Sequence, residues 1–277
     1  MMSKKVRISP AYRRQEDLLR QKVLSASLPF EARLDKQRTR LVNSIAKGLK
    51  ALPVTEWEQW AREEVKEPYL KKWFMDMYWA AGQPAGERAI RNFLNIKAAE
   101  GMNTWERALY EWMGSQMGNK IVIVSGTLKE WVINTILQYV DEHSTEGVEK
   151  VVSEVEGYIR QKWKDAKQWQ IRRIVQTESL TAMSEAADVA IKSLGIKYSK
   201  TWGISGHNTR EAHVVMDGVT IGQNELFNVN GELMEFPRDA KYGASASNII
   251  NCRCYCIRKP LNDRGGLVTD EDILNMV

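Results

Sequence analysis

Apolar residues recur at helical spacing along most of the first 195 residues. The first clear stripe runs from Leu34 through Leu41 and Ile45 to Leu49. Similar stripes follow as far as Gly195, where a glycine is expected to end the last long helix. This pattern predicts a body made of long amphipathic helices.

Helix boundaries inside this body are predicted from capping residues and helix breakers. A capping box places Ser, Thr or Asn three positions before Glu at the start of a helix. Residues 121–124 (IVIV), taken alone, read as a short strand. The predicted boundaries are caps at Thr55, Asn103 and Thr127, ends at Gly82 and Gly101, a first helical turn at Pro84, and a turn within 143–150.

The pattern changes after Gly195, where short alternating runs and turn residues replace the helical stripes. Asp217-Gly218 and Asn230-Gly231 are signals for tight turns. Strands are expected at 197–202, 219–221, 226–229 and 249–257, with a short helix within 209–215.

These patterns predict a mainly α protein with a small α+β C-terminal unit behind a long-helix N-terminal body. Three divisions are expected: a helical body over 1–165 with a basic N-terminal arm, a unit over 166–260, and a C-terminal tail over 261–277. The second division would combine the last long helix with the small α+β part.

Basic residues gather at the start of the chain. The formal net charge of the 277 residues is +5, but residues 1–50 hold thirteen Lys or Arg against four acidic residues, a net +9. Such an arm favours phosphates of DNA or an acidic protein surface, and the alternative is a solvated helix face. The candidate contact residues are Lys4, Lys5, Arg7, Arg13, Arg14 and Arg20.

The sequence contains no apolar run near the roughly 20 residues needed to span a bilayer, so membrane insertion is not expected. The basic N-terminus lacks the apolar stretch of a secretory signal. The three cysteines, Cys252, Cys254 and Cys256, are odd in number and too closely spaced for an ordinary disulfide framework. A reducing compartment is therefore expected.

The same cysteines raise the question of a metal site. In a strand Cys252, Cys254 and Cys256 would share one face, and His207 and His213 lie about forty residues upstream. His213, Cys252 and Cys254 are the candidate ligands of a structural zinc. The preferred interpretation is that no cofactor is bound, because the usual Cys-x2-Cys spacing is absent and buried cysteines are common small apolar residues.

Catalysis is a second interpretation of this segment. A cysteine or serine nucleophile with His213 as base and Asp217 as its orienting partner would resemble a hydrolytic triad. No oxyanion loop and no nucleotide-binding glycine motif is recognisable, so the chain is expected not to be an enzyme.

A charge pair is expected to join the two parts of the unit over 166–260. Glu178 lies on the last long helix and Arg210 in the polar segment that follows. A salt bridge between them would dock the small α+β part on the helix, whereas the alternative is two exposed charges.

A series of motifs runs through residues 165–258, about a third of the chain. The helix segment RRIVQTESLTAMSEA is followed by a tryptophan, Arg-x2-His, Asp-Gly, a phenylalanine, Pro-x-Asp and Asn-Cys-Arg-Cys. In this order and spacing they resemble the head-morphogenesis family of tailed phages (Mu F-type minor head proteins). The residues are Thr177, Glu178, Trp202, Arg210, His213, Asp217, Gly218, Phe227, Pro237, Asp239, Asn251, Cys252, Arg253 and Cys254.

The resemblance implies a minor capsid protein that lies inside the phage head, is assembled in the host cytoplasm and associates with the portal protein. It implies a role in head assembly and in packaging or delivery of the genome. Major capsid or scaffold protein and packaged double-stranded DNA are the further partners it suggests. One departure is visible, because the family's Ala-Arg-Thr-Glu reads Val175-Gln176-Thr177-Glu178 here.

Two alternative functions remain beside this one. A non-specific DNA-binding protein would depend on the basic arm, and a hydrolase or nuclease would depend on His213, Asp217 and the cysteines. The order of preference is head protein, DNA-binding protein, enzyme.

Overall fold

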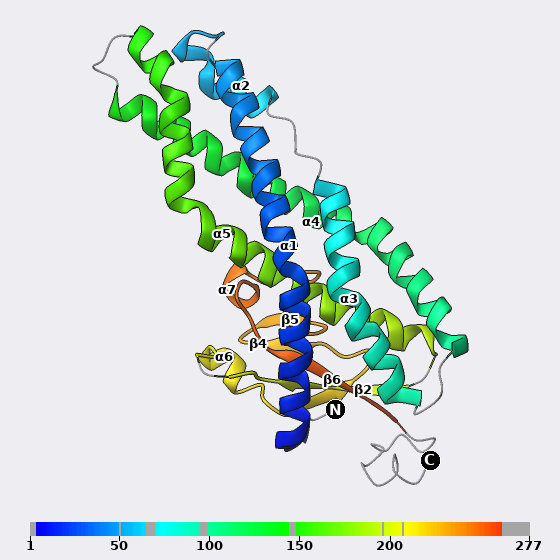
Figure 1. Ribbon diagram of the computed structural model, residues 1–277. Coiled ribbons are helices and arrows are strands. Elements are labelled where there is room, and N and C mark those ends of the chain that lie inside the picture. Colours follow the sequence, from blue (N-terminus) through cyan, green and yellow to red (C-terminus); the bar gives the residue numbers. More distant parts are fainter. Residues whose placement is uncertain are drawn as a thin grey trace. The chain divides into compact units, whose positions relative to one another are not determined.

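The computed structural model describes residues 4–49, 51–64, 70–94, 99–143, 148–195, 197–206 and 208–261. It confirms the mainly α class with a small α+β C-terminal part (Figure 1). The elements in chain order are β1 (Lys4–Lys5), α1 (Pro10–Leu49), a 3-10 turn (Val54–Glu56), α2 (Trp57–Glu64), α3 (Leu70–Leu94), α4 (Ala99–Glu142), α5 (Val148–Ser193), β2 (Tyr198–Gly203), α6 (Glu211–Val214), β3 (Val219–Gly222), β4 (Phe227–Val229), β5 (Glu232–Met234), α7 (Ala246–Ile249) and β6 (Tyr255–Pro260).

The chain forms two compact units that are discontinuous in sequence, whereas the predicted divisions were continuous ranges. The first unit holds residues 1–28, 77–113 and 175–277, and the second holds 29–76 and 114–174. Helices α1, α3, α4 and α5 each contribute residues to both units. Apart from Leu261, the predicted tail over 261–277 lies outside the described residues.

In the second unit, the end of α1 packs with α2 and the second half of α4. The indole N–H of Trp57 donates to the Leu52 carbonyl (3.1 Å) and fixes the start of α2. Burying large apolar side chains of this kind stabilises a core by about 1.5–3 kcal/mol each. The core residues are Ile45, Leu49, Trp57, Ile133, Ile136 and Tyr139.

Several predicted helix boundaries are wrong because packing overrides local signals. Thr55 lies inside the 3-10 turn, whose N-cap residue is Pro53 and has no side-chain cap hydrogen bond. Gly101, Asn103, residues 121–124 and Thr127 are all interior to α4, so no strand forms at 121–124.

Gly82 and Pro84 are likewise interior to α3. A Cβ at Gly82 would lie 2.9 Å from the Cβ of Ala186 on α5, so Gly82 serves close helix packing and does not end a helix. By contrast, the predicted break within 143–150 is confirmed, since α4 ends at Glu142 and α5 begins at Val148.

The first unit contains a four-stranded antiparallel sheet in the order β1-β3-β2-β6. Strand β2 is buried along its whole length, and β3 and β6 pair with its two edges. Strands β4 and β5 form a separate hairpin closed by Asn230 and Gly231, both at positive φ as the turn signal predicts. The predicted strand over 249–257 is partly wrong, because residues 246–249 are α7 and β6 starts only at Tyr255.

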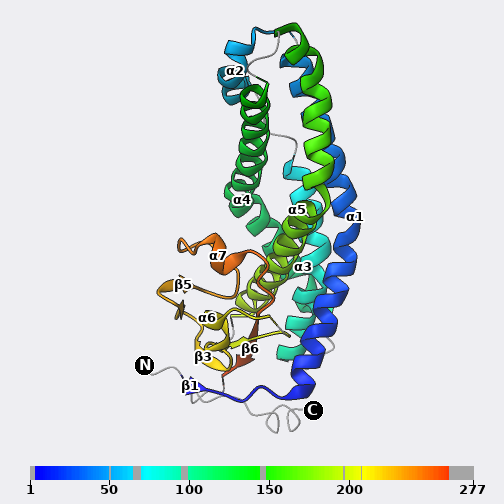
Figure 2. The ribbon, with the colours of Figure 1, turned by 90° about the vertical axis from the view of Figure 1, so that its left-hand side faces the viewer.

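Strand β1 was not predicted. Lys4 and Lys5 pair with Thr220 and Val219 of β3, which places the start of the basic arm at the sheet edge (Figure 2). The backbone N–H of Val6 also donates to the Gly218 carbonyl (2.8 Å). No helix among the described residues is both long and apolar enough to cross a bilayer.

Candidate functional site

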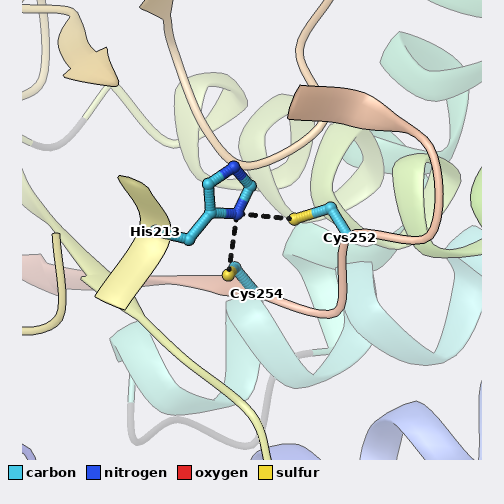
Figure 3. Close-up of side chains that lie close together, drawn as sticks. All are labelled: His213, Cys252 and Cys254. Atoms are coloured by element: carbon cyan, nitrogen blue, oxygen red, sulfur yellow. Dashed lines mark hydrogen bonds between the residues drawn. The ribbon is translucent and has the colours of Figure 1, made fainter. Parts of the chain in front are cut away.

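Three side chains converge in the first unit, from α6 and from the segment before β6 (Figure 3). The Nδ1 atom of His213 lies 3.5 Å from the sulfur of Cys252 and 3.4 Å from that of Cys254. The exposed fractions of the three residues are 1%, 2% and 3%. The candidate ligands named from sequence are thus brought together and removed from bulk water.

Local backbone geometry produces this convergence. Helix α6 is a single turn in which the His213 N–H bonds to the Arg210 carbonyl (2.9 Å), and it presents His213 to the interior. On the other side, Asn251, two residues after the end of α7, adopts a left-handed φ of 58°. The extended chain that follows buries Cys252 and Cys254 on one side and exposes Arg253 on the other.

The orientation of the His213 ring is fixed by a short polar chain. Glu232 accepts a hydrogen bond from the Asn248 amide nitrogen (2.8 Å), so the Asn248 oxygen faces Nε2 of His213 (3.1 Å). An amide oxygen only accepts, so Nε2 carries the proton and Nδ1 keeps its lone pair. That lone pair is directed at the two sulfurs.

Arg238 organises the cysteine segment from the other side. Its guanidinium is 1% exposed and donates to the carbonyls of Cys252 (3.0 Å) and Cys254 (2.6 Å). It also donates to the Leu180 carbonyl (2.8 Å) and the Ser184 hydroxyl (2.7 Å) on α5. One buried cation therefore ties the cysteine segment to the helix.

The two thiols differ in their pKa. A hydrogen bond from the neighbouring Cys254 thiol holds the pKa of the Cys252 thiol well below its usual range. The pKa of Cys254 is raised, because the neighbouring Cys252 and burial both disfavour a second thiolate.

Cys256 does not belong to this group. It lies in β6, is half-buried, and borders a small cavity of about 40 Å³ together with Tyr12 and Arg258. The third cysteine predicted to share the face is thus not a ligand candidate. His207, the second histidine considered, lies outside the described residues.

A pocket of about 310 Å³ adjoins the cluster. Its lining is polar, and His213, Cys252 and Cys254 form part of its wall. The other lining residues are Ser205, Asn208, Thr209, Arg210, Asn251 and Arg253.

The structure does not join His213 to Asp217 as the catalytic interpretation required. The Asp217 carboxylate accepts two hydrogen bonds from Arg13 (3.2 and 2.7 Å) and one from the Ile204 N–H (3.1 Å). His213 is oriented by Asn248 instead. Asp217 therefore fixes a loop and the N-terminal helix.

The expected pair between Glu178 and Arg210 is also replaced by other contacts. Glu178 accepts from the Tyr78 hydroxyl (2.6 Å), and Arg210 donates to the Ile250 carbonyl. Docking on the last helix runs instead through Thr177, whose hydroxyl accepts from the Asn251 N–H (3.3 Å), and through Arg238.

The other motif residues pack around the cluster. Trp202 lies edge-on to His213 (ring centroids 5.5 Å apart, 84°) and to Phe227 (5.3 Å, 75°). Asp239 accepts from the Glu235 N–H (2.8 Å) and fixes the loop after β5. These contacts make the motif residues one folded module.

The candidate contact residues of the basic arm are used in different ways. Arg13 bonds to Asp217, and Arg20 pairs with Asp17 (3.1 Å) and bonds to the Ser205 hydroxyl. Arg7 and Arg14 have exposed side chains. Lys4 and Lys5 form β1.

Sequence reasoning missed three buried polar residues: Arg238, Asn248 and Asp188. Asp188 on α5 pairs with Arg258 of β6 (3.2 Å) and Lys192 (2.6 Å). The Pro-x-Asp motif contains Pro237 and Asp239 but places no requirement on Arg238 between them. No local sequence pattern marks Arg238 as a buried residue that bonds to several segments of the chain.

No family model matches the chain, and no solved structure matches it. The uncharacterized protein YqbB of Bacillus subtilis (strain 168) is 36% identical over 92 residues. This match covers 31% of the present chain and 29% of YqbB, so the chain spans less than a third of that relative.

Proposed function

We propose that this protein is a head-morphogenesis protein of a tailed phage that acts by binding other proteins of the head, the portal protein first. In this proposal the motif module is a structural and docking unit. Its copies would be built into the head during assembly in the host cell.

The observation that carries the proposal is that the motif residues form one module. Thr177 and Asn251 are 74 residues apart and share a hydrogen bond, and Trp202 joins His213 and Phe227. A set of motifs that resembles one family in order and spacing is thus joined in space as well. This supports treating the resemblance as a property of a folded unit.

The chemistry of the module favours binding over catalysis. His213 and both neighbouring thiols are at most 3% exposed, and the carboxylate of Asp217 is occupied by Arg13 and Ile204. A hydrolytic triad needs a carboxylate that orients the histidine, whereas His213 is oriented by the Asn248 amide oxygen. These contacts support a structural role for the residues that resemble a catalytic set.

Helix α1 offers a surface for a partner. Arg14, Leu18 and Lys22 are exposed and recur at four-residue spacing, which places them on one helix face. The side chain of Leu18 is 57% exposed. A face that mixes cations with an exposed apolar side chain suits an acidic protein surface.

The direct test is co-expression of the full chain with the portal protein of the same phage. Co-purification through size-exclusion chromatography is expected, with the copies per portal ring counted by mass spectrometry. Assembled heads that lack the protein, or a portal that elutes without it, would contradict the proposal. The double variant Arg14→Glu/Lys22→Glu is expected to weaken co-purification, and Lys71→Glu, an exposed lysine of the second unit, is the control.

DNA binding is the second candidate, favoured by the exposed Arg7 and Arg14. Phosphate contacts make affinity fall steeply as salt rises from about 50 to 200 mM. Retention of double-stranded DNA fragments on filters should then decrease over that range and be lost in Arg7→Glu/Arg14→Glu. Equal retention by the variant would reject this candidate.

A further inference from the structure

His213, Cys252 and Cys254 have the spacing of metal ligands. With zinc–sulfur bonds of about 2.3 Å and zinc–nitrogen bonds of about 2.0 Å, two ligands of a tetrahedral ion lie about 3.5 Å apart. The distances from Nδ1 of His213 to the two sulfurs are 3.5 and 3.4 Å. We propose that Nδ1 of His213 and the sulfurs of Cys252 and Cys254 bind a zinc ion.

The histidine is prepared for this role by its neighbours. Ligating histidines donate their second ring N–H to a carbonyl or carboxylate, which fixes the tautomer and the ring orientation. Here Nε2 faces the Asn248 oxygen at 3.1 Å, and Asn248 is held in turn by Glu232 at 2.8 Å. The free lone pair of Nδ1 therefore lies on the side of the sulfurs.

Arg238 supports the two sulfurs. It binds the carbonyls of both cysteines, and its Nη1 lies 4.0 Å from the sulfur of Cys252. Among the described residues, none of the ion pairs involves Arg238, so its charge faces the cysteine segment and α5 without a carboxylate partner. A buried cation beside a sulfur favours the thiolate form, which is the form that binds metal.

The convergence of two thiols on one nitrogen distinguishes a metal site from a catalytic pair. The single lone pair of Nδ1 can accept a proton from only one thiol. A catalytic cysteine–histidine pair therefore does not need a second cysteine. A metal ion uses both. Two thiolates and an imidazole form a soft ligand set that favours zinc over magnesium, calcium or manganese.

All three ligands lie in the wall of the polar pocket of about 310 Å³, so a fourth ligand would come from that pocket. Water can occupy the fourth coordination position, as in zinc sites with three protein ligands. The ion would link α6 to the segment before β6, two parts of the chain about 40 residues apart. This inference does not depend on the proposed function.

Elemental analysis of the full chain tests the site. The protein is purified under reducing conditions without chelator from cells grown with zinc, and zinc, iron and copper are measured by plasma mass spectrometry. About one zinc per chain is expected, as for a single site of this ligand set. Cys252→Ser, Cys254→Ser and His213→Gln should each lose the zinc, and Cys256→Ser is the matched control that should keep it.

A second measurement does not depend on how the variants fold. Wild-type protein is stripped with a chelator and titrated with cobalt, whose visible and thiolate charge-transfer bands report tetrahedral sulfur coordination. Saturation at about one cobalt per chain is expected. Wild-type protein that holds no zinc and shows no such bands would overturn the proposal, as would iron or copper in place of zinc, or loss of zinc from Cys256→Ser as large as that from Cys252→Ser.

Discussion

The guanidinium of Arg13 makes two hydrogen bonds with the carboxylate of Asp217, 204 residues later in the chain. Arg13 belongs to the basic arm, and Asp217 belongs to the Asp-Gly motif. The same carboxylate also accepts from the Ile204 N–H (3.1 Å). One residue of the arm therefore holds the first helix on the C-terminal module and is not a free cation.

Replacing Arg13 by Gln should destabilise the first unit modestly. The pair is partly exposed, so the expected loss is about 1 kcal/mol of unfolding free energy. Urea denaturation followed by circular dichroism would measure it. Arg14→Gln removes an equivalent charge from an exposed position and should leave the midpoint unchanged; equal midpoints for the two variants would contradict the role of Arg13.

Replacing Gly218 by Ala should detach the N-terminal strand. Gly218 has a φ of 78°, and a Cβ there would lie 2.2 Å from the Val6 carbonyl oxygen. The left-handed backbone alone costs an alanine about 1–2 kcal/mol, and the clash adds to that cost. Trypsin should cleave after Lys5 and Arg7 faster in the variant than in the wild type.

The control for Gly218 is Gly231, which has a similar φ of 88° but open space around its Cβ position. Gly231→Ala should show only the backbone cost of about 1–2 kcal/mol and no change in cleavage after Lys5 and Arg7. If both variants expose the arm to trypsin equally, the contact with Val6 is not what holds β1.

Local signals predicted the C-terminal part of the fold better than the helical part. The turn at Asn230-Gly231 depends on two residues that tolerate positive φ, and such a preference can be read from the chain itself. The role of Gly82 depends on Ala186, which is remote in sequence, so a glycine that serves packing was interpreted as a helix end. The predicted helix caps at Asn103 and Thr127, both inside α4, are wrong for the same reason.

The candidate site was predictable only in its reactive residues. His213, Cys252 and Cys254 are conspicuous by type, so they could be grouped before their distances were known. Arg238 and Asn248 are not, because an arginine is usually exposed and an asparagine usually marks a turn. Their roles come from the approach of α5, β5 and α7 to the cysteine segment, which no short-range pattern encodes.

Replacing Arg238 by Lys should be strongly destabilising although the charge is kept. Lysine has one nitrogen and cannot reach the carbonyls of both cysteines and the Leu180 carbonyl together. Losing buried hydrogen bonds to a charged group costs about 1.5–3 kcal/mol each, so we expect a loss of at least about 3 kcal/mol. The control is Arg253→Lys, which changes the exposed arginine between the two cysteines and should have the wild-type urea midpoint. If Arg238→Lys had the same urea midpoint as the wild type, the prediction would be contradicted.

The buried carboxylate of Asp188 should make stability depend on pH in the acid range. Burial alone would raise the pKa of Asp188, but the charges of Arg258 and Lys192 outweigh burial and hold that pKa below its ordinary value. A lowered pKa contributes stability that is complete above the ordinary carboxyl pKa of about 4 and is lost as the pH falls below it. Asp188→Asn should therefore lose about 3–5 kcal/mol near neutral pH, since it leaves the Arg258 charge buried without its partner.

The measurement is the difference in unfolding free energy between wild type and Asp188→Asn at several pH values. That difference should stay constant above pH of about 5 and shrink below about 4, because protonation of the wild-type carboxylate removes the same interaction that the substitution removes. Asp141→Asn changes an exposed aspartate of α4 and should follow the wild type throughout. If the difference stays constant down to about pH 2.5, the Asp188 carboxylate does not titrate in this range. That result would contradict the pH dependence expected for a single carboxyl group with a lowered pKa.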